Sequence, residues 1–134
     1  MIDTTTKEVI SVWIGTSEKT FDEFDKYLEG LEDPNSNCPA HKDWGTTFID
    51  TDFFVAEGTI DRKVVPIEEL VKGIGCNSKK TQLSIVKKAK EMGINDGNSY
   101  YYYLDATFHE KTPGALYNDL KFVGTFPDPR KKYR

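Results

Sequence analysis

The sequence predicts an α+β domain, with two main helices packed against a mixed or mostly antiparallel sheet of about four strands. Short runs of β-branched and aromatic residues predict strands, and two longer segments with helical spacing of apolar residues predict the helices. The expected order is β-α-β-α-α-β-β, and no repeat of 20–50 residues appears. Because the last two strands are consecutive, we expect them to pair antiparallel. A chain of 134 residues suits one domain over residues 1–134.

The first strand is expected over residues 8–14, an almost continuous apolar run that ends at Gly15. Such a run is typical of a central strand buried on both faces. A helix is expected to follow, from an N-cap at Thr20 to about residue 31, because Thr20 and Glu23 have the spacing of a capping box. Its apolar side chains recur along one stripe: Phe21, Phe24, Leu28 and Leu31.

Acidic residues occupy the neighbouring stripe of this helix, with the same spacing shifted by one position. They are Asp22, Asp25, Glu29 and Glu32. Like charges at these spacings weaken a helix by a few tenths of a kcal/mol per pair, so helix stability does not explain them. The stripe is either an ordinary solvated face, with Lys26 relieving some repulsion, or a face that binds a partner.

Residues 32–45 are expected to form a loop, since Pro, Asn, Ser and Gly are dense there. Within it, Trp44 is either an interface anchor or a cap on the core. Residues 46–57 alternate as a strand would, which places Asp50 and Asp52 close together on one partly exposed face. This pair, with the nearby Glu57, is a second candidate for a partner-binding surface.

The second half of the chain predicts a short helix over residues 67–73 and a long one that begins after Ser78 and ends at Gly93. Its expected inner face is Leu83, Val86 and Ala89, flanked by Ile85 and Met92, and its other positions carry Lys79, Lys80, Lys87, Lys88 and Lys90. Strands are expected over residues 99–108 and 120–126. The basic segment 128–134 is expected to fray.

Four consecutive tyrosines open the first of these two strands. Alternation in a strand places Tyr100 and Tyr102 on one face and Tyr101 and Tyr103 on the other. At least one pair is expected in the core. An outward pair would suit a protein interface, where tyrosine is enriched.

The net charge of −4 hides an asymmetry along the chain. Residues 1–62 hold 14 acidic and 5 basic side chains, a net of −9, and residues 63–134 hold 8 acidic and 13 basic, a net of +5. An acidic surface repels nucleic acid and attracts basic proteins. Nucleic-acid binding is therefore not favoured, although the lysine-rich helix leaves a weak interaction open.

The sequence shows no convincing catalytic or metal site. Asp50 and Asp52 lack further ligands at motif spacing, and Cys38 with His41 lacks two convergent partners for zinc. No activated thiol is evident, and we expect Cys38 and Cys76 to be free thiols. We therefore expect neither a cofactor nor an enzyme. The N-terminal residues do not resemble a signal peptide and no apolar run would span a bilayer, so we expect a cytoplasmic protein with no membrane partner.

Three stretches resemble the immunity protein 22 family. The first, VISVWIGTSEKTFDEFDKYLE, has an apolar strand that ends in Trp13, Ile14 and Gly15, followed by a helix with Glu23, Phe24, Tyr27 and Leu28. The second, IDTDFFVAEG, resembles an acidic strand of that family, and the third, LKFVGTFP, resembles its closing strand. The three stretches are spread over most of the chain.

The resemblance implies an antidote of a bacterial polymorphic toxin system. Such a protein would bind a cognate toxin domain, often a nuclease, and block it without catalysis. The expected partner-binding residues are Asp22, Asp25, Glu29, Asp50, Asp52, Glu57 and Trp44. The alternative is a binding or scaffold module outside toxin systems, or a weak nucleic-acid binder that uses the lysine-rich helix.

Overall fold

The computed structural model describes residues 1–130, and it confirms the predicted α+β class. Five antiparallel strands form a curled sheet in the order β3-β6-β2-β9-β8. Their bounds are β2 Val9–Gly15, β3 Phe54–Gly58, β6 Ser99–Leu104, β8 Leu116–Tyr117 and β9 Leu120–Pro127.

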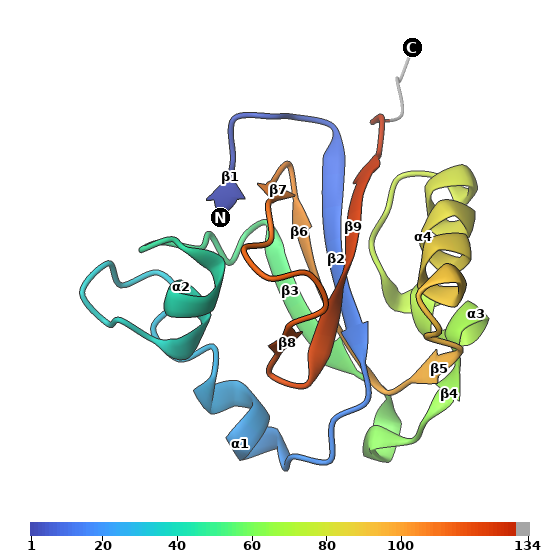
Figure 1. Cartoon of the computed structure of the whole chain (residues 1–134), viewed down its shortest axis with the longest axis horizontal. Coiled ribbons are helices and arrows are strands. Elements are labelled where there is room, and N and C mark those ends of the chain that lie inside the picture. Colours follow the sequence, from blue (N-terminus) through green and yellow to red (C-terminus); the bar gives the residue numbers. More distant parts are fainter. Residues whose placement is uncertain (131–134) are drawn as a thin grey trace.

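Helices cover both faces of this sheet (Figure 1). On one side lie α1 (Phe21–Lys26) and α2 (Pro39–Trp44), and on the other lie α3 (Ile67–Leu70) and α4 (Lys79–Glu91). Two short ribbons complete the fold: β1 (Ile2–Asp3) with β7 (Thr107–Phe108), and β4 (Val65–Pro66) with β5 (Asp96–Gly97). Single 3₁₀ turns are η1 (Ile60–Arg62) and η2 (Val71–Gly73). Within residues 1–130, no helix combines the length and apolar character needed to cross a bilayer.

Strand β2 is central and buried on both faces, as its apolar run predicts. Ile10, Val12 and Ile14 point toward α3 and α4, and Trp13 points into the cluster beneath α1 and α2. The four tyrosines of β6 alternate as expected: Tyr101 and Tyr103 join the α1–α2 cluster, while Tyr100 joins the α3–α4 cluster and Tyr102 packs at its edge. Both faces of this strand therefore serve the core.

The predicted pairing of the last two strands is wrong. Strand β2 lies between β6 and β9 and pairs antiparallel with both. The register of β2 with β9 shifts between Val12 and Trp13, where Val123 is the extra residue of a bulge. The extra residue changes the alternation of β9, so that Phe126, which an unbroken period of two would place on the face of Phe122, packs in the opposite cluster. The two strands that are consecutive in the prediction do not pair with each other, because β2, the most apolar strand, lies between them.

The first helix is shorter than predicted, and the expected loop after it contains another helix. α1 keeps its capping box, since the amide of Glu23 donates to the Thr20 hydroxyl at 3.2 Å, but it ends at Lys26. The chain then turns through Gly30, whose φ of 87° is left-handed. α2 begins with Pro39 at its first position and ends where Gly45 adopts a φ of 63°.

The strand predicted over residues 46–57 begins only at Phe54, because the chain turns sharply before it. The Asp50 carboxylate accepts a hydrogen bond from the amide of Asp52 at 2.9 Å, and the Asp50 carbonyl accepts from Phe53 and Phe54 at 3.0 Å. An aspartate that binds the backbone two residues on favours a turn over a strand. The two aspartates are therefore close together, but in a turn and not on a strand face.

Helix α4 starts at its predicted cap, where the Ser78 hydroxyl accepts from the amide of Thr81 at 3.2 Å, and Gly93 follows its end with a φ of 82°. Its buried residues are Thr81, Ile85 and Ala89, so Ala89 is confirmed as part of the inner face, and Val86 packs against the α3–α4 cluster. The Thr81 hydroxyl donates to the Pro127 carbonyl at 3.0 Å, which fixes this face toward β9. Leu83, predicted to be inside, is 58% exposed.

The first residues of the basic segment, 128–130, make specific contacts with the rest of the chain. Asp128 is buried, and its carboxylate accepts from the amide of Asn77 at 2.7 Å. Arg130 forms an ion pair with Asp105, and its amide donates to Glu8 at 3.1 Å. Residues 131–134 lie outside the described residues.

Candidate functional site: an acidic partner-binding surface

The acids of α1 are exposed, as the sequence predicts. Asp22 and Asp25 lie on α1, and Glu29 lies in the turn that follows it. Glu23 has a local role, because hydrogen bonds from the Thr20 amide and hydroxyl lower the pKa of its carboxyl. The remaining carboxylates are free to meet a partner.

The turn at residues 50–53 is joined to the segment that follows α1. The amide of Ile49 donates to the Leu31 carbonyl at 2.9 Å, and the amide of Thr51 donates to the Glu32 carboxylate at 3.3 Å. Ile49 itself is fully buried, so it fixes the turn to the core. These bonds hold the turn at residues 50–53 against residues 31–32, so Glu32 lies beside the turn. We call the acids of α1, of the segment that follows it and of this turn the acidic surface: Asp22, Asp25, Glu29, Glu32 and Asp52, which are exposed, and Asp50, which is half-buried.

Two exposed aromatic side chains flank this turn, and sequence reasoning missed them. Phe48 is 46% exposed and Phe53 is 42% exposed. With Asp50 they border a cavity of about 400 Å³ between the turn and the N-terminal segment. Exposed aromatic residues beside a concavity are typical of protein-binding surfaces. The Asp-Thr-Asp turn within a run of strand-forming residues was the signal that could have revealed them.

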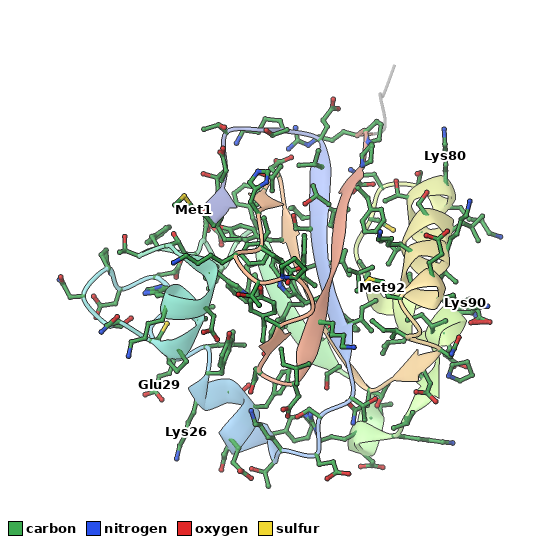
Figure 2. All side chains as sticks on the ribbon, viewed as in Figure 1. Met1, Lys26, Glu29, Lys80, Lys90 and Met92 are labelled. Carbon is green, nitrogen blue, oxygen red and sulfur yellow. The ribbon has the colours of Figure 1, made fainter. Side chains whose placement is uncertain are left out.

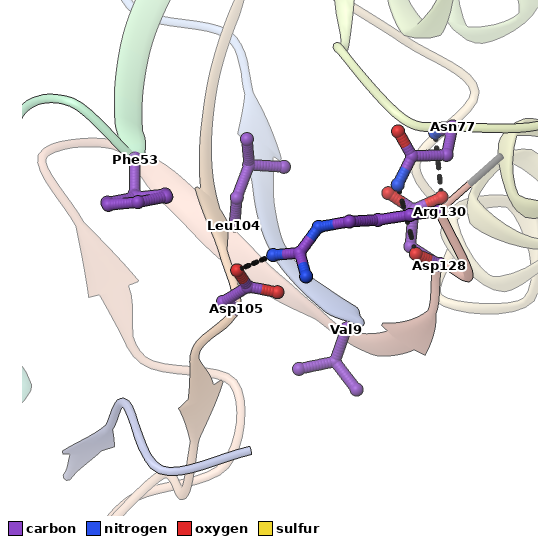
Figure 3. Close-up of a pocket in the computed structure, with 7 residues that line it drawn as sticks. All are labelled: Val9, Phe53, Asn77, Leu104, Asp105, Asp128 and Arg130. Atoms are coloured by element: carbon purple, nitrogen blue, oxygen red, sulfur yellow. Dashed lines mark hydrogen bonds and ion pairs between the residues drawn. The ribbon is translucent and has the colours of Figure 1, made fainter. Parts of the chain in front are cut away.

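A second hollow, of about 310 Å³, adjoins the first and shares Phe53, Leu104 and Asp105 with it (Figure 3). Figure 3 shows Arg130 reaching across this hollow to Asp105, while Asp128 is tied to Asn77. These contacts hold the end of β9 against the β6–β7 corner. The charged side chains that line the second hollow are therefore already paired with other groups of this chain.

Trp44 is not part of this surface, because none of it is exposed. Its ring packs against Trp13 at a centroid distance of 4.9 Å and against Phe54 at 5.4 Å. Of the two roles that the sequence left open, the structure supports the core position. Helix α2, absent from the prediction, is what carries this side chain inward.

Glu57 is exposed but lies apart from the acids of α1. Its carboxylate accepts a hydrogen bond from the Tyr100 hydroxyl at 2.9 Å, on the face of the sheet that α3 and α4 cover. Burial, together with this acidic partner, raises the pKa of Tyr100. Glu57 therefore lies on the edge strand with its side chain on the α3–α4 face.

The lysines of α4 occupy the opposite side of the molecule from α1 and α2. Figure 2 shows Lys80 and Lys90 on α4, with Glu29 far from them beside α1. Lys90 pairs with Glu68 at 3.3 Å. The charge asymmetry of the sequence is thus a spatial asymmetry as well, with an acidic surface at one end and a basic helix at the other.

The candidate metal ligands do not converge. Among residues 1–130, no three His, Cys, Asp or Glu side chains lie in an arrangement that could hold a metal ion. Both cysteines are free thiols: Cys38 lies in the α1–α2 cluster, and Cys76 packs beside the α3–α4 cluster. His41 is buried, with its Nε2 atom 2.7 Å from the Leu31 carbonyl oxygen, so it supports the local fold.

Comparison with models of protein families matches residues 10–127 to the family described as immunity protein 22. This range includes the whole of the five-stranded sheet except Val9, and both helical layers. No curated protein and no solved structure matches the chain.

Proposed function

Because the chain belongs to the immunity protein 22 family, we propose that it binds one cognate toxin domain through its acidic surface and covers the active site of that toxin. Membership supports a toxin-neutralising role in general, and the structure supplies a candidate surface for it. The mechanism would be stoichiometric occlusion, with no bond made or broken by this chain. The protein would act in the bacterial cytoplasm, as part of a polymorphic toxin system.

The observation that carries this proposal is the joining of two acidic segments beside exposed aromatic rings. The Ile49–Leu31 and Thr51–Glu32 hydrogen bonds hold these segments together, and Phe48 and Phe53 stand next to them. A tight interface usually contains aromatic anchor residues surrounded by charged residues. The charged residues disfavour the binding of other proteins. An interface of about 1,200–2,000 Å² in total would be ordinary for such a complex.

The chemistry of the surface favours a basic toxin. Nucleases bind phosphates with lysine and arginine, so a nuclease domain is one toxin that fits. A surface of clustered carboxylates would attract such a domain over several ångströms and raise the association rate at low salt. The same carboxylates would compete with the phosphates of the substrate for the basic residues of the toxin.

The direct test is co-expression with the toxin domain encoded next to this gene. We expect this chain to restore growth and to co-purify with the toxin in a one-to-one complex. A toxin that remains lethal, and that forms no complex with the purified chain, would contradict the proposal.

A further inference from the structure

Strand β3, with five residues, forms one edge of the sheet, and β8, with two residues, forms the other. The amide of Phe54 at the start of β3 already donates to the Asp50 carbonyl. The amide of Leu104 donates to the Phe53 carbonyl, and the amide of Thr59 donates to the Asn98 carbonyl, both at 2.9 Å. In an antiparallel ladder the hydrogen-bonded positions alternate, so residues 53, 55, 57 and 59 bond to β6. The amides and carbonyls of Ala56 and Gly58 therefore point away from the sheet. Within residues 1–130, no partner is found for them.

This edge lacks the features that normally block pairing with another chain. Edge strands are usually protected by lysine, proline, a bulge or a covering segment. β3 has the sequence FVAEG, and its register with β6 runs without a shift. Its one charge, Glu57, is held by the Tyr100 hydroxyl against a face of the sheet and does not lie across the edge. The edge is consequently flat and open at Ala56 and Gly58.

The surroundings of the edge define the chemistry of a strand that would pair with it. Residues 48–61 contain four acids, Asp50, Asp52, Glu57 and Asp61, and no base. Phe53 is exposed at one end of β3, and Ile60, 87% exposed, follows the other end. A matching strand would carry lysine or arginine, with apolar side chains near its ends.

A second copy of this chain is a poor occupant of the edge. Two copies of residues 48–61 would bring eight acids and no base into one interface. Like charges brought close across paired strands are destabilising. Charge therefore favours a basic partner over self-association.

We propose that the toxin adds a basic β-strand to the outer edge of β3, with its main chain paired to Ala56 and Gly58. Strand addition to a sheet edge provides affinity through the main chain and specificity through alternate side chains. This inference rests on the proposed function, and it names how the toxin docks. The acidic turn before β3 and the edge itself would then form one continuous interface.

The test is the pair of variants Ala56→Pro and Ala56→Ser, with the purified toxin domain encoded next to this gene as the probe. Proline removes the outward amide and leaves the bonds of Val55 and Glu57 to β6, which an edge strand tolerates. Serine retains the amide and serves as the matched control. By calorimetry, we expect Ala56→Pro to raise Kd at least about tenfold and Ala56→Ser to change it less than about twofold.

A measurement on the unaltered protein keeps the test decisive if Ala56→Pro does not fold. By NMR amide exchange, the Ala56 and Gly58 amides should exchange quickly in the free protein and at least about tenfold more slowly in the complex. The Val55 and Glu57 amides should be protected in both states. A complex in which Ala56 and Gly58 still exchange quickly overturns strand addition and leaves the proposed function standing. Absence of any complex overturns the proposed function, and strand addition with it.

Discussion

The amide of Ile49 donates to the carbonyl oxygen of Leu31 at 2.9 Å, and this bond joins the segment that follows α1 to the acidic turn before β3. Because Ile49 is fully buried, the junction is part of the core and not a loose surface contact. The carboxylates before and after it are thus held in a fixed relationship. A rigid arrangement of charge can distinguish one basic partner from another.

Reversing charge on the acidic surface should slow association with the toxin and spare the fold. The variant Asp22→Lys, Asp25→Lys and Asp52→Lys avoids Asp50, whose carboxylate stabilises its own turn. We expect the association rate to fall at least about tenfold at low salt, because electrostatic steering is lost. Stopped-flow kinetics would measure this rate, and the difference should shrink as salt is raised.

The matched control reverses three lysines of α4, Lys80, Lys87 and Lys88, to glutamate. All three are exposed and lie on α4, on the opposite side of the sheet from α1 (Figure 1). We expect this variant to associate with the toxin at the same rate as the original chain. A large effect of the α4 variant with none from the acidic variant would move the interface to the basic helix.

Truncating the exposed phenylalanines should weaken binding more than it affects stability. For Phe53→Ala we expect a loss of about 2 kcal/mol in binding, roughly thirtyfold in Kd, as for an interface anchor. The control is Leu83→Ala, which truncates an exposed apolar residue on α4 and should not affect Kd. Calorimetry of both variants against the toxin domain checks this, and equal Kd values for the two would exclude Phe53 from the interface.

Trp44→Ala should act on stability and not on recognition. Removing a buried aromatic side chain costs about 3–5 kcal/mol in the free energy of unfolding. Chemical denaturation measures this loss, with Phe48→Ala as a surface control expected within about 0.5 kcal/mol of the original chain. If Trp44→Ala retains full stability, the aromatic cluster around Trp13 is not the core described above.

The tyrosines predict a marked loss of stability at alkaline pH. Burial raises the pKa of all six tyrosines that the structure describes, and acidic partners add to this at Tyr27, Tyr100 and Tyr117. In the unfolded chain these phenols ionise near pH ~10, so unfolding releases protons above that pH. Their contribution is complete below pH ~10 and is lost as pH rises beyond it.

This loss is measurable as a fall in Tm between pH ~9 and ~11, followed together with tyrosinate absorbance. Tyrosinate absorbance should appear at a higher pH than it does for free tyrosine. It should then rise as the protein unfolds. Gradual ionisation of most tyrosines in a protein that remains folded would contradict their burial.

Local signals in the sequence predicted those elements that depend on neighbouring residues. Ser78 caps α4, Gly93 follows its end, and Thr20 with Glu23 begins α1, because each of these features needs only the chain within a few positions. The burial of β2 and the alternation of Tyr100 to Tyr103 follow from composition and the twofold period of a strand.

The remaining features depend on contacts between distant segments, which no local pattern contains. Leu83 was expected inside α4, but the Thr81–Pro127 bond rotates another face toward the sheet. Likewise, β2 separates β6 from β9, and only their placement in space shows this. The acidic residues were predicted individually, whereas their proximity depends on the Ile49–Leu31 bond and the buried position of Trp44 depends on α2.

The central position of β2 has a consequence for synthesis of the protein. Both neighbours of this early strand, β6 and β9, come from the last third of the chain. During translation, β2 has no neighbouring strand until β6 has left the ribosome, and it lacks its second neighbour until residue 127 has done so. A nascent chain halted before Leu120 lacks β9 and should therefore remain open to proteases.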